Sequence, residues 1–430
     1  MFHNKLEFKL ANSEQIVHLG SKTVSIYASS NEPADFSFSF EQRHISLSKP
    51  GDIVVLRKGK VPWDYIDYHQ SLIKGNVNVI EVEEDKKNQN LSLPQLLMKS
   101  LGSINKIKKL LDKNAVLMVW DSTKDEQKVA NMLEIPLWGS PKINYKYGHK
   151  SGARLLAKKC NLNIPFGKSC STIEMVLKYL KILKDTDIKK VIIKYDESYG
   201  GIGHLVIEDL NKNNGRKVKT FLNAVKQNLG GGWTIEQWVP SKKTIGSHIE
   251  ININKEICLS YLWQQIIDKD NVSYNGAIPL EISEIHFNQL INHMKIIADF
   301  IIKQGGQGSF GPDFMLGKNG QIYFNELNAR IPSTAFPLQI TKQIKGYIPK
   351  GFLATSIKTD KGIKFKDLRF RLEKNNLLYP SRDNDGLIPY HVGQLEWGNF
   401  YFVIISDSQK KSQFYYKKTI KLFKNNKATR

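Results

Sequence analysis

The sequence predicts two fold types in succession, an α/β region with a parallel sheet and then an α+β region with antiparallel sheets. Over residues 1–145 short β-rich runs alternate with helical stretches, whereas residues 146–344 carry many hairpin-like strands and few helices. Alternation places helices on the faces of a parallel sheet, and consecutive hairpins build antiparallel sheets. With 430 residues and 41% hydrophobic content, the chain can form two or three packed domains.

The first region combines strands rich in Val and Ile with segments of helical spacing. The expected strands are 24–28, 52–56, 77–82 and 115–120. The expected helices are 65–73, 93–111 and 124–133, the last preceded by Asp121-Ser122-Thr123 as a helix cap. No G-x-G-x-x-G motif occurs in this region, which argues against a dinucleotide site.

In the second region a helix over 150–160 precedes a long series of strands. These strands are expected at 191–194, 204–208, 234–239, 248–253, 258–264, 309–316 and 321–327. One helix, 286–303, lies among them, and its apolar stripe consists of Leu290, Met294, Ile297 and Ile301. After about residue 345 the chain is rich in lysine and shows one clear apolar strand, 400–405.

Several classes of protein are excluded by composition. No apolar run approaches the roughly 18 residues of a membrane helix, and the first ten residues lack the apolar core of a signal peptide. Three cysteines, Cys160, Cys170 and Cys258, cannot build a disulfide framework and lack zinc-ligand spacing. We therefore expect a reduced, cytoplasmic protein with no membrane partner.

The segment GPDFMLGKNGQIYFNELNAR carries the clearest chemical signal. Two strand-like runs flank Asn319-Gly320, a strong hairpin turn, and a two-residue turn there pairs Asp313 directly with Glu326. Asn328 then projects from the same face. Because like charges opposite each other destabilise a sheet, a cation is expected between them, and oxygen ligands suit Mg²⁺. The alternative is that both carboxylates are ordinary solvated strand residues.

A second signal is a strand that ends in Lys194 and is followed by a glycine-rich turn. The turn contains Gly200, Gly201 and Gly203 and leads into another strand. Glycines let backbone N–H groups approach phosphate closely, and lysine supplies a positive charge. The turn is no Walker loop, and a plain β-turn also explains it.

Taken in order, these motifs resemble those of ATP-grasp ligases over roughly residues 150–339. The resemblance implies that ATP is bound by Lys150, Lys194, Gly200, Gly201, Gly203 and the adenine linker Glu236, Gln237, Trp238 and Val239, the linker mainly through its backbone. It implies Mg²⁺ ligands at Asp313, Glu326 and Asn328. It also implies catalytic roles for Lys194 and Arg330, with Arg330 near the reacting carboxylate and phosphate.

The flanking sequence is similar to ligases that carry a pre-ATP-grasp domain, including peptide ligases of the pheganomycin type. This implies a pre-ATP-grasp parallel-sheet domain over 1–145 and an ATP-grasp domain with antiparallel sheets over 146–344. The ATP-grasp domain would divide into a glycine-loop lid, 146–240, and a metal and substrate subdomain, 241–344. Residues 345–430 would be a basic segment that completes or flanks this core.

The family chemistry implied is formation of an amide or peptide bond through an acyl-phosphate, with release of ADP and phosphate. ATP and Mg²⁺ would be the cofactors, and the partners would be small amino acids or peptides that carry a carboxylate and an amine. We allow for a homodimer. The alternative is a catalytically silent ATP-binding scaffold of the same fold.

The sequence departs from the family pattern at two places. Gly311 stands where many peptide-forming members carry arginine, and Lys243 and Thr244 stand where a glutamate often contacts the ribose. His248 could contact the ribose or the substrate, or be structural. Ser333 and Thr334 follow Arg330 in a loop and could hold the substrate carboxylate.

The net charge of +22 is unevenly distributed. From residue 341 to 430 there are 19 Lys and Arg against seven Asp and Glu, a surplus of 12. The last stretch interleaves aromatic residues with lysines, as a nucleic-acid binder also does, but its one arginine is Arg430 and it has no reading motif. We expect a frayed basic terminus, an acidic small-molecule substrate and no nucleic-acid partner.

Overall fold

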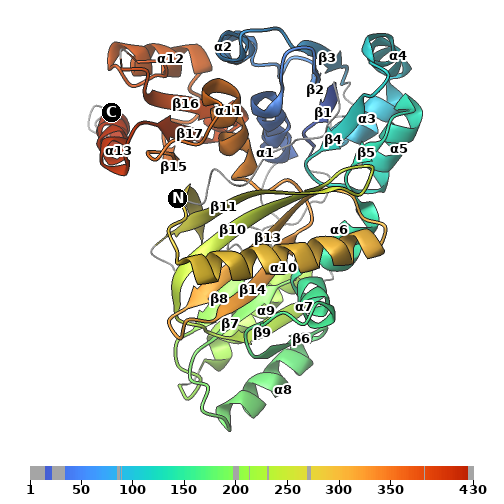
Figure 1. Ribbon diagram of the computed structural model, residues 1–430. Coiled ribbons are helices and arrows are strands. Elements are labelled where there is room, and N and C mark those ends of the chain that lie inside the picture. Colours follow the sequence, from blue (N-terminus) through green and yellow to red (C-terminus); the bar gives the residue numbers. More distant parts are fainter. Residues whose placement is uncertain are drawn as a thin grey trace.

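The computed structural model describes residues 15–21, 34–84, 88, 90–196, 203–212, 214–229, 232–268, 273–381 and 383–424. These residues form three β-sheets with helices packed on them (Figure 1). Sheet A has five strands in the order β3-β2-β1-β4-β5, sheet B has four in the order β6-β9-β7-β8, and sheet C has eight. No helix in the described part of the chain combines the length and apolar character needed to cross a membrane.

Sheet A is parallel throughout, as the alternating pattern predicted. Its strands are β1 (Ile16–Leu19), β2 (Ile53–Arg57), β3 (Asn78–Val82), β4 (Val116–Val119) and β5 (Leu137–Trp138). Strands β1, β2 and β4 are buried along their whole length, which explains their continuous apolar runs. The central strand β1 was not predicted, and the strand expected at 24–28 lies outside the described residues.

The helices beside sheet A include α1 (Ala34–Phe38), the 3-10 segment η2 (Ser39–Leu47) and α2 (Trp63–Ile73), whereas α6 (Pro141–Tyr147) packs into the core of sheet C. The predicted helix 93–111 is two helices, α3 (Leu93–Lys99) and α4 (Leu101–Leu110), because Ser100 leaves the helical conformation at ψ 76°. Helix α5 (Lys124–Leu133) starts where predicted: Thr123 accepts from the Asp125 N–H, and Glu126 accepts from the Thr123 N–H in a capping box.

Sheet B is a small antiparallel sheet of β6 (Gly167–Cys170), β7 (Val191–Tyr195), β8 (His204–Ile207) and β9 (Trp233–Gln237). Two helices that were not predicted accompany it, α8 (Ile173–Lys184) and α9 (Gly215–Leu229). Val176 and Leu222 from these helices pack with Ile193 and Ile235 of the sheet in one buried cluster. The expectation of few helices in this region was therefore wrong.

Sheet C is antiparallel in the order β14-β13-β10-β11-β12-β15-β17-β16. Its strands are β10 (Ser241–Ile251), β11 (Ile257–Ile267), β12 (Tyr274–Pro279), β13 (Gly308–Gly317), β14 (Ile322–Asn328), β15 (Leu353–Lys358), β16 (Gly386–Tyr390) and β17 (Asn399–Ile405). Helix α10 (Glu284–Lys303) runs across one face of the sheet (Figure 1), with the predicted stripe Leu290, Met294, Ile297 and Ile301 fully buried. Helix α7 (Lys150–Lys159) shares this core.

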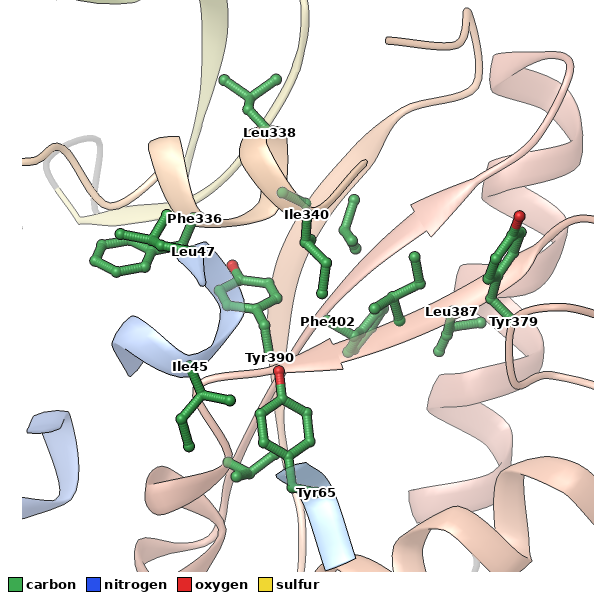
Figure 2. Packing of buried hydrophobic residues seen from close by; sticks show 14 of the residues in the cluster. Ile45, Leu47, Tyr65, Phe336, Leu338, Ile340, Tyr379, Leu387, Tyr390 and Phe402 are labelled. Carbon is green, nitrogen blue, oxygen red and sulfur yellow. The ribbon is translucent and has the colours of Figure 1, made fainter. Parts of the chain in front are cut away.

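The C-terminal residues are an integral part of sheet C. They supply β15, β16 and β17 and the helices α12 (Phe365–Lys374) and α13 (Gln409–Lys424), so the expected frayed terminus is instead helical at least to residue 424. Their core is shared with η2, α2 and α11 (Ala335–Lys345). Figure 2 shows Ile45 and Leu47 of η2 beside Phe336 and Tyr390, which joins the first region to the last.

Candidate active site

One cleft lies between sheets B and C, and most of the predicted site residues line it. They come from α7, β7, β9, the hairpin β13–β14 and the loop after it, and they are Lys150, Lys194, Glu236, Gln237, Trp238, Val239, Asp313, Glu326, Asn328, Arg330, Ser333 and Thr334. Residues that were far apart in the sequence therefore meet as the motif order predicted. Gly200 and Gly201 lie outside the described residues.

The hairpin β13–β14 pairs Asp313 with Glu326, as predicted, although its turn differs from the expected one. The Gly317 N–H donates to Gln321 O at 2.9 Å, so three residues, not two, form the loop, and Gly320 has a φ of +80°. Near the turn the strands are shifted by one residue, with Phe314 opposite Phe324. A bulge at Asn325 restores the register at the carboxylates.

The bulge also brings a residue that the sequence did not reveal into the site. Asn325 lines the cleft, and its Oδ1 accepts a hydrogen bond from Lys194 Nζ at 2.7 Å. Strict alternation would have turned Asn325 away from the face that carries Glu326. Because the alternating pattern does not encode a bulge, no simple sequence signal points to Asn325.

In the carboxylate pair Asp313 is buried and Glu326 is half-buried, and together with Asn328 they have the donor set of a metal site. Asn328 Nδ2 donates to Asp313 Oδ2 at 3.1 Å, and Lys150 Nζ contacts Glu326 Oε2. Burial and the neighbouring Glu326 raise the pKa of Asp313 well above its ordinary value. Burial also acts to raise the pKa of Glu326, but Lys150 and Lys194 outweigh it and lower that pKa to about 2.

Such a pair disfavours full ionisation unless more positive charge arrives, as a divalent cation would supply. Two carboxylates and an amide are the hard oxygen ligands that Mg²⁺ takes together with substrate phosphates, so the residues fit this ion. In the described residues no cluster of three or more His, Cys, Asp or Glu side chains is placed to hold a metal.

Lys194 belongs to a buried ion-pair network on the sheet B side of the cleft. Lys194 Nζ lies 2.7 Å from Glu236 Oε2, and Arg154 Nη1 lies 2.6 Å from Glu236 Oε1. Burial acts to raise the pKa of Glu236, but Lys194 and Arg154 lower it below the ordinary value. The Glu236 side chain is thus committed to this network. Arg154, four residues after Lys150 on α7, was missed although i and i+4 share a helix face.

The linker after β9 forms the far end of the cleft. Gln237 N–H donates to Phe166 O at 2.7 Å, and Trp238 N–H donates to Lys190 O at 2.9 Å. The Lys190 ammonium lies 4.3 Å from the Trp238 ring centroid, which holds the indole in place. A backbone that is held by these two hydrogen bonds beside the Trp238 indole is suited to bind a planar base.

Gly203 closes the β7–β8 hairpin. Its φ is +76°, which favours glycine, and its carbonyl accepts from the Tyr195 N–H at 2.8 Å. The next residue, His204, lines the cleft although the sequence did not single it out.

Arg330 is held by the parallel-sheet region. Its Nη2 donates to Asn328 Oδ1 at 2.7 Å, its Nε lies 3.8 Å from Asp121 Oδ1, and its guanidinium lies 4.9 Å from the Trp120 ring centroid. Trp120 Nε1 in turn donates to Ile331 O at 3.0 Å. The sequence predicted Trp120 only as the end of a strand and Asp121 only as part of a helix cap.

The position of Gly311 explains one departure from the family pattern. A Cβ there would lie 3.0 Å from the Cβ of Pro332, so the loop after Arg330 occupies the space of a larger side chain. The wall next to this loop is formed by sheet C residues that were not predicted, Thr244, Trp263, Gln265, Ile267 and Tyr274. Tyr274 and Thr334 share a hydrogen bond of 2.6 Å between their hydroxyls.

His248, for which the sequence left ribose contact, substrate contact and a structural role open, is not among the residues that line the cleft. It is buried in β10 with Nε2 3.9 Å from Glu250 Oε1. Burial lowers the pKa of His248 to about 3 and raises that of Glu250 well above its ordinary value. Lys243, at the expected ribose position, donates instead to Gln264 Oε1 at 2.7 Å, whereas Thr244 lines the cleft.

Comparisons with known proteins find similarity in fold alone. No protein-family model matches the chain, and no curated protein matches its sequence. The ADP complex of N5-carboxyaminoimidazole ribonucleotide synthetase superposes with a TM-score of 0.60 at 13% identity, covering 97% of this chain and 99% of that one. The Staphylococcus aureus N5-carboxyaminoimidazole synthetase complexed with ADP gives 0.56 at 13% identity, covering 96% and 99%.

Biotin carboxylase from Campylobacter jejuni matches with a TM-score of 0.60 at 14% identity, covering 93% of this chain and 89% of that one. A parallel sheet that precedes two antiparallel sheets, with a cleft between the latter, agrees with these matches over nearly the whole chain. The chain therefore has the ATP-grasp fold with an N-terminal parallel-sheet domain.

Proposed function

We propose that the protein is an ADP-forming carboxylate–amine ligase that makes an amide or peptide bond. The observation that carries this proposal is the facing of opposite charges across one cleft. Asp313, Glu326 and Asn328 lie on sheet C, and Lys150, Lys194 and Arg330 reach the same space. An arrangement with paired acids and three cations is suited to a metal-bound triphosphate next to a carboxylate.

ATP would lie with its base at the linker Gln237 to Val239 and its phosphates toward Lys150 and Lys194. Asp313, Glu326 and Asn328 would hold Mg²⁺, which supplies positive charge that neutralises the phosphate oxygens. Residues 146–240 would act as a lid over 241–344. Such a lid matters because water would hydrolyse an activated acyl group.

The chain's residues then have defined tasks in two displacement steps. A carboxylate oxygen of the acid attacks the γ-phosphorus, a new O–P bond forms, and ADP leaves as the bond to the bridging oxygen breaks. The amine nitrogen next attacks the acyl carbon, the C–O bond to phosphate breaks, and nitrogen loses a proton. Arg330 orients the acid and Lys194 stabilises the transferred phosphoryl charge. Ser333 and Thr334 would contact the acid.

The test is an assay with ATP, Mg²⁺ and pooled amino acids that measures ADP, AMP and phosphate and detects amides by mass spectrometry. We expect ADP, phosphate and an amide product in equal amounts. Release of AMP and pyrophosphate would overturn the proposal. Tight ATP binding without any product across the pool would instead favour the silent scaffold.

A parallel reaction with bicarbonate in place of the amino acids addresses a second ATP-dependent chemistry. The biotin carboxylase domain of a 2-oxoglutarate carboxylase, whose fold also matches with a TM-score of 0.54, was crystallised with MgADP and bicarbonate. Bicarbonate-dependent ADP release, with none from amino acids, would assign carboxylation and reject amide formation.

A further inference from the structure

Arg43, on the η2 segment, is a buried cation that has no role in the proposed reaction. The residue is 4% exposed. Its guanidinium carbon lies 4.4 Å from the Phe40 ring centroid, 4.3 Å from that of Trp120 and 5.1 Å from that of Phe336. Aromatic faces attract a cation, but they cannot accept hydrogen bonds as an oxygen does.

The hydrogen-bonding groups of Arg43 are incompletely used. Within the described part of the chain, neither its Nε nor its Nη1 has a hydrogen-bond partner. Buried donors are almost always paired, and a buried charge is costly unless a counter-charge accompanies it. Burial and the nearby Arg330 lower the pKa of Arg43 to about 9, so the group still carries its charge at neutral pH.

Arg43 is connected to the cleft through a shared ring. Arg330, which lines the cleft, lies 4.9 Å from the same Trp120 centroid that Arg43 contacts. Phe336, another of the rings around Arg43, stands two residues after Thr334, in the segment that follows Arg330. Two guanidinium groups thus lie within 5 Å of one indole centroid, one of them lining the cleft and the other buried behind it, and Asp121 is an acid that acts on both.

We propose that Arg43 and Arg330 form an anion subsite for a second acidic group of the substrate, apart from the carboxylate that reacts. The subsite rests on the proposed function only for the identity of the cleft as a substrate site. A guanidinium presents a planar fork of donors that matches the two oxygens of a carboxylate or phosphate. A bound anion would supply acceptors for the Nε and Nη1 donors of Arg43 and would add negative charge beside two guanidinium groups that now share Asp121.

The competing explanation is that Arg43 serves only to fill the aromatic cage and to support Trp120. The two explanations differ for the free protein. If Arg43 is a structural element, replacing it removes favourable ring contacts and lowers the melting temperature. If it awaits an anion, replacing it removes an incompletely paired buried charge, and the melting temperature of the anion-free protein stays the same or rises.

The experiment is a thermal-shift titration of the full chain, without ATP, using malonate, inorganic phosphate, acetate and chloride as probes. The variants are Arg43→Met, Arg43→Lys and the control Lys366→Met, which removes an exposed lysine on α12. We expect malonate and phosphate to raise the melting temperature of the wild type in a saturable way. Arg43→Met should require at least tenfold more of either probe, Arg43→Lys an intermediate amount, and the control should match the wild type.

Three results would overturn the subsite: no saturable response of the wild type, an equal response of Arg43→Met, or a melting temperature of anion-free Arg43→Met at least 5 °C below the control. None of these depends on turnover, so failure of the ligase assay is separable from failure of the subsite. If the ligase assay succeeds, Arg43→Met should raise KM at least tenfold for a dicarboxylic acid. The KM for ATP and for a monocarboxylic acid should not change.

Discussion

Two sides of the cleft differ in how their charges are satisfied: the proposed nucleotide side, around Lys150, Lys194 and Glu236, and the proposed substrate side, around Arg330, Trp120 and Arg43. On the proposed nucleotide side Lys150 lies beside Glu326, and Lys194 and Arg154 both lie beside Glu236. On the substrate side Arg43 has two buried donors without partners in the described residues. Under the proposed function, the first side would be preorganised for ATP by its own ion pairs, whereas the second would be completed by an anionic group of the substrate.

The largest effect is expected from Glu326→Gln, which removes a charge from the proposed metal pair. ADP release should fall on the order of 10³-fold, because phosphate charge would no longer be neutralised by a well-held metal. Asp299→Asn, an exposed acid on α10, is the matched control and should keep full activity. Circular dichroism should show both variants folded. Activity of Glu326→Gln within tenfold of the wild type would exclude Glu326 as a ligand.

The next effect is expected in stability, from Glu236→Gln. This change leaves Lys194 and Arg154 without their buried counter-charge, and we expect a loss of about 3 kcal/mol in the free energy of unfolding. The control is Glu208→Gln: Glu208 pairs with Lys190 at 2.7 Å but its side chain is 73% exposed, so the loss should stay within about 0.5 kcal/mol. Urea titrations of the three proteins give the comparison. Equal losses in both variants would mean that the buried network contributes no more to the free energy of unfolding than an exposed ion pair does.

The same network has a predictable pH dependence. Lys194 and Arg154 lower the pKa of Glu236 below its ordinary value of 4.5, although burial acts in the opposite direction. A carboxyl group with a lowered pKa contributes stability above its unfolded pKa and loses it as pH falls through the folded pKa. The difference between wild type and Glu236→Gln should therefore be full at pH 7 and shrink below pH 4.5. A difference that grew on acidification would contradict this sign.

The contrast between the two sides also explains what the sequence could and could not reveal. Asp313, Glu326 and Asn328 sit in one short continuous motif, where strand alternation predicts one shared face, and Lys194 sits near the end of a strand of its own in sheet B. Even there, Asp313 met Glu326 only because a longer turn and a bulge at Asn325 offset each other. The substrate side is assembled from η2, the end of β4 and the loop after β14. Contacts such as that of Trp120 with Arg330 join residues 210 positions apart, and local periodicity does not encode them.

Strands β15 and β16 were not predicted from the sequence, for a related reason. Strands β15 and β16 carry few distinctive residues of their own and are fixed by pairing with β17, which the apolar run had revealed. His248 lies on β10 and is 1% exposed, and strand alternation by itself does not distinguish a buried polar residue from one that faces a ligand.

On the substrate side the main test is Arg330→Met, with Arg330→Lys for comparison. We expect kcat/KM for the acid to fall roughly 10²-fold with methionine, because the cation that orients the carboxylate and offsets developing charge is lost. Lysine should recover part of this loss, since it keeps the charge but not the planar fork. The KM for ATP should change little. If instead the KM for ATP rose as much as that for the acid, Arg330 would belong to the nucleotide side.

The smallest effect separates the positioning of Arg330 from its charge. Trp120→Phe keeps a ring for Arg330 but removes the Nε1 donor that binds Ile331 O at 3.0 Å. The loss of one hydrogen bond of about 1 kcal/mol predicts about a fivefold rise in KM for the acid, with the KM for ATP unchanged. Trp138→Phe is a close control, because that buried indole also loses one hydrogen bond, to Ser309 Oγ at 3.2 Å, without touching the loop of Arg330. Should both variants shift the KM for the acid equally, the effect would come from general loosening of the parallel-sheet domain. A shift confined to Trp120→Phe would show that this domain sets the geometry of the substrate side through a single ring, while the nucleotide side depends on its own ion pairs.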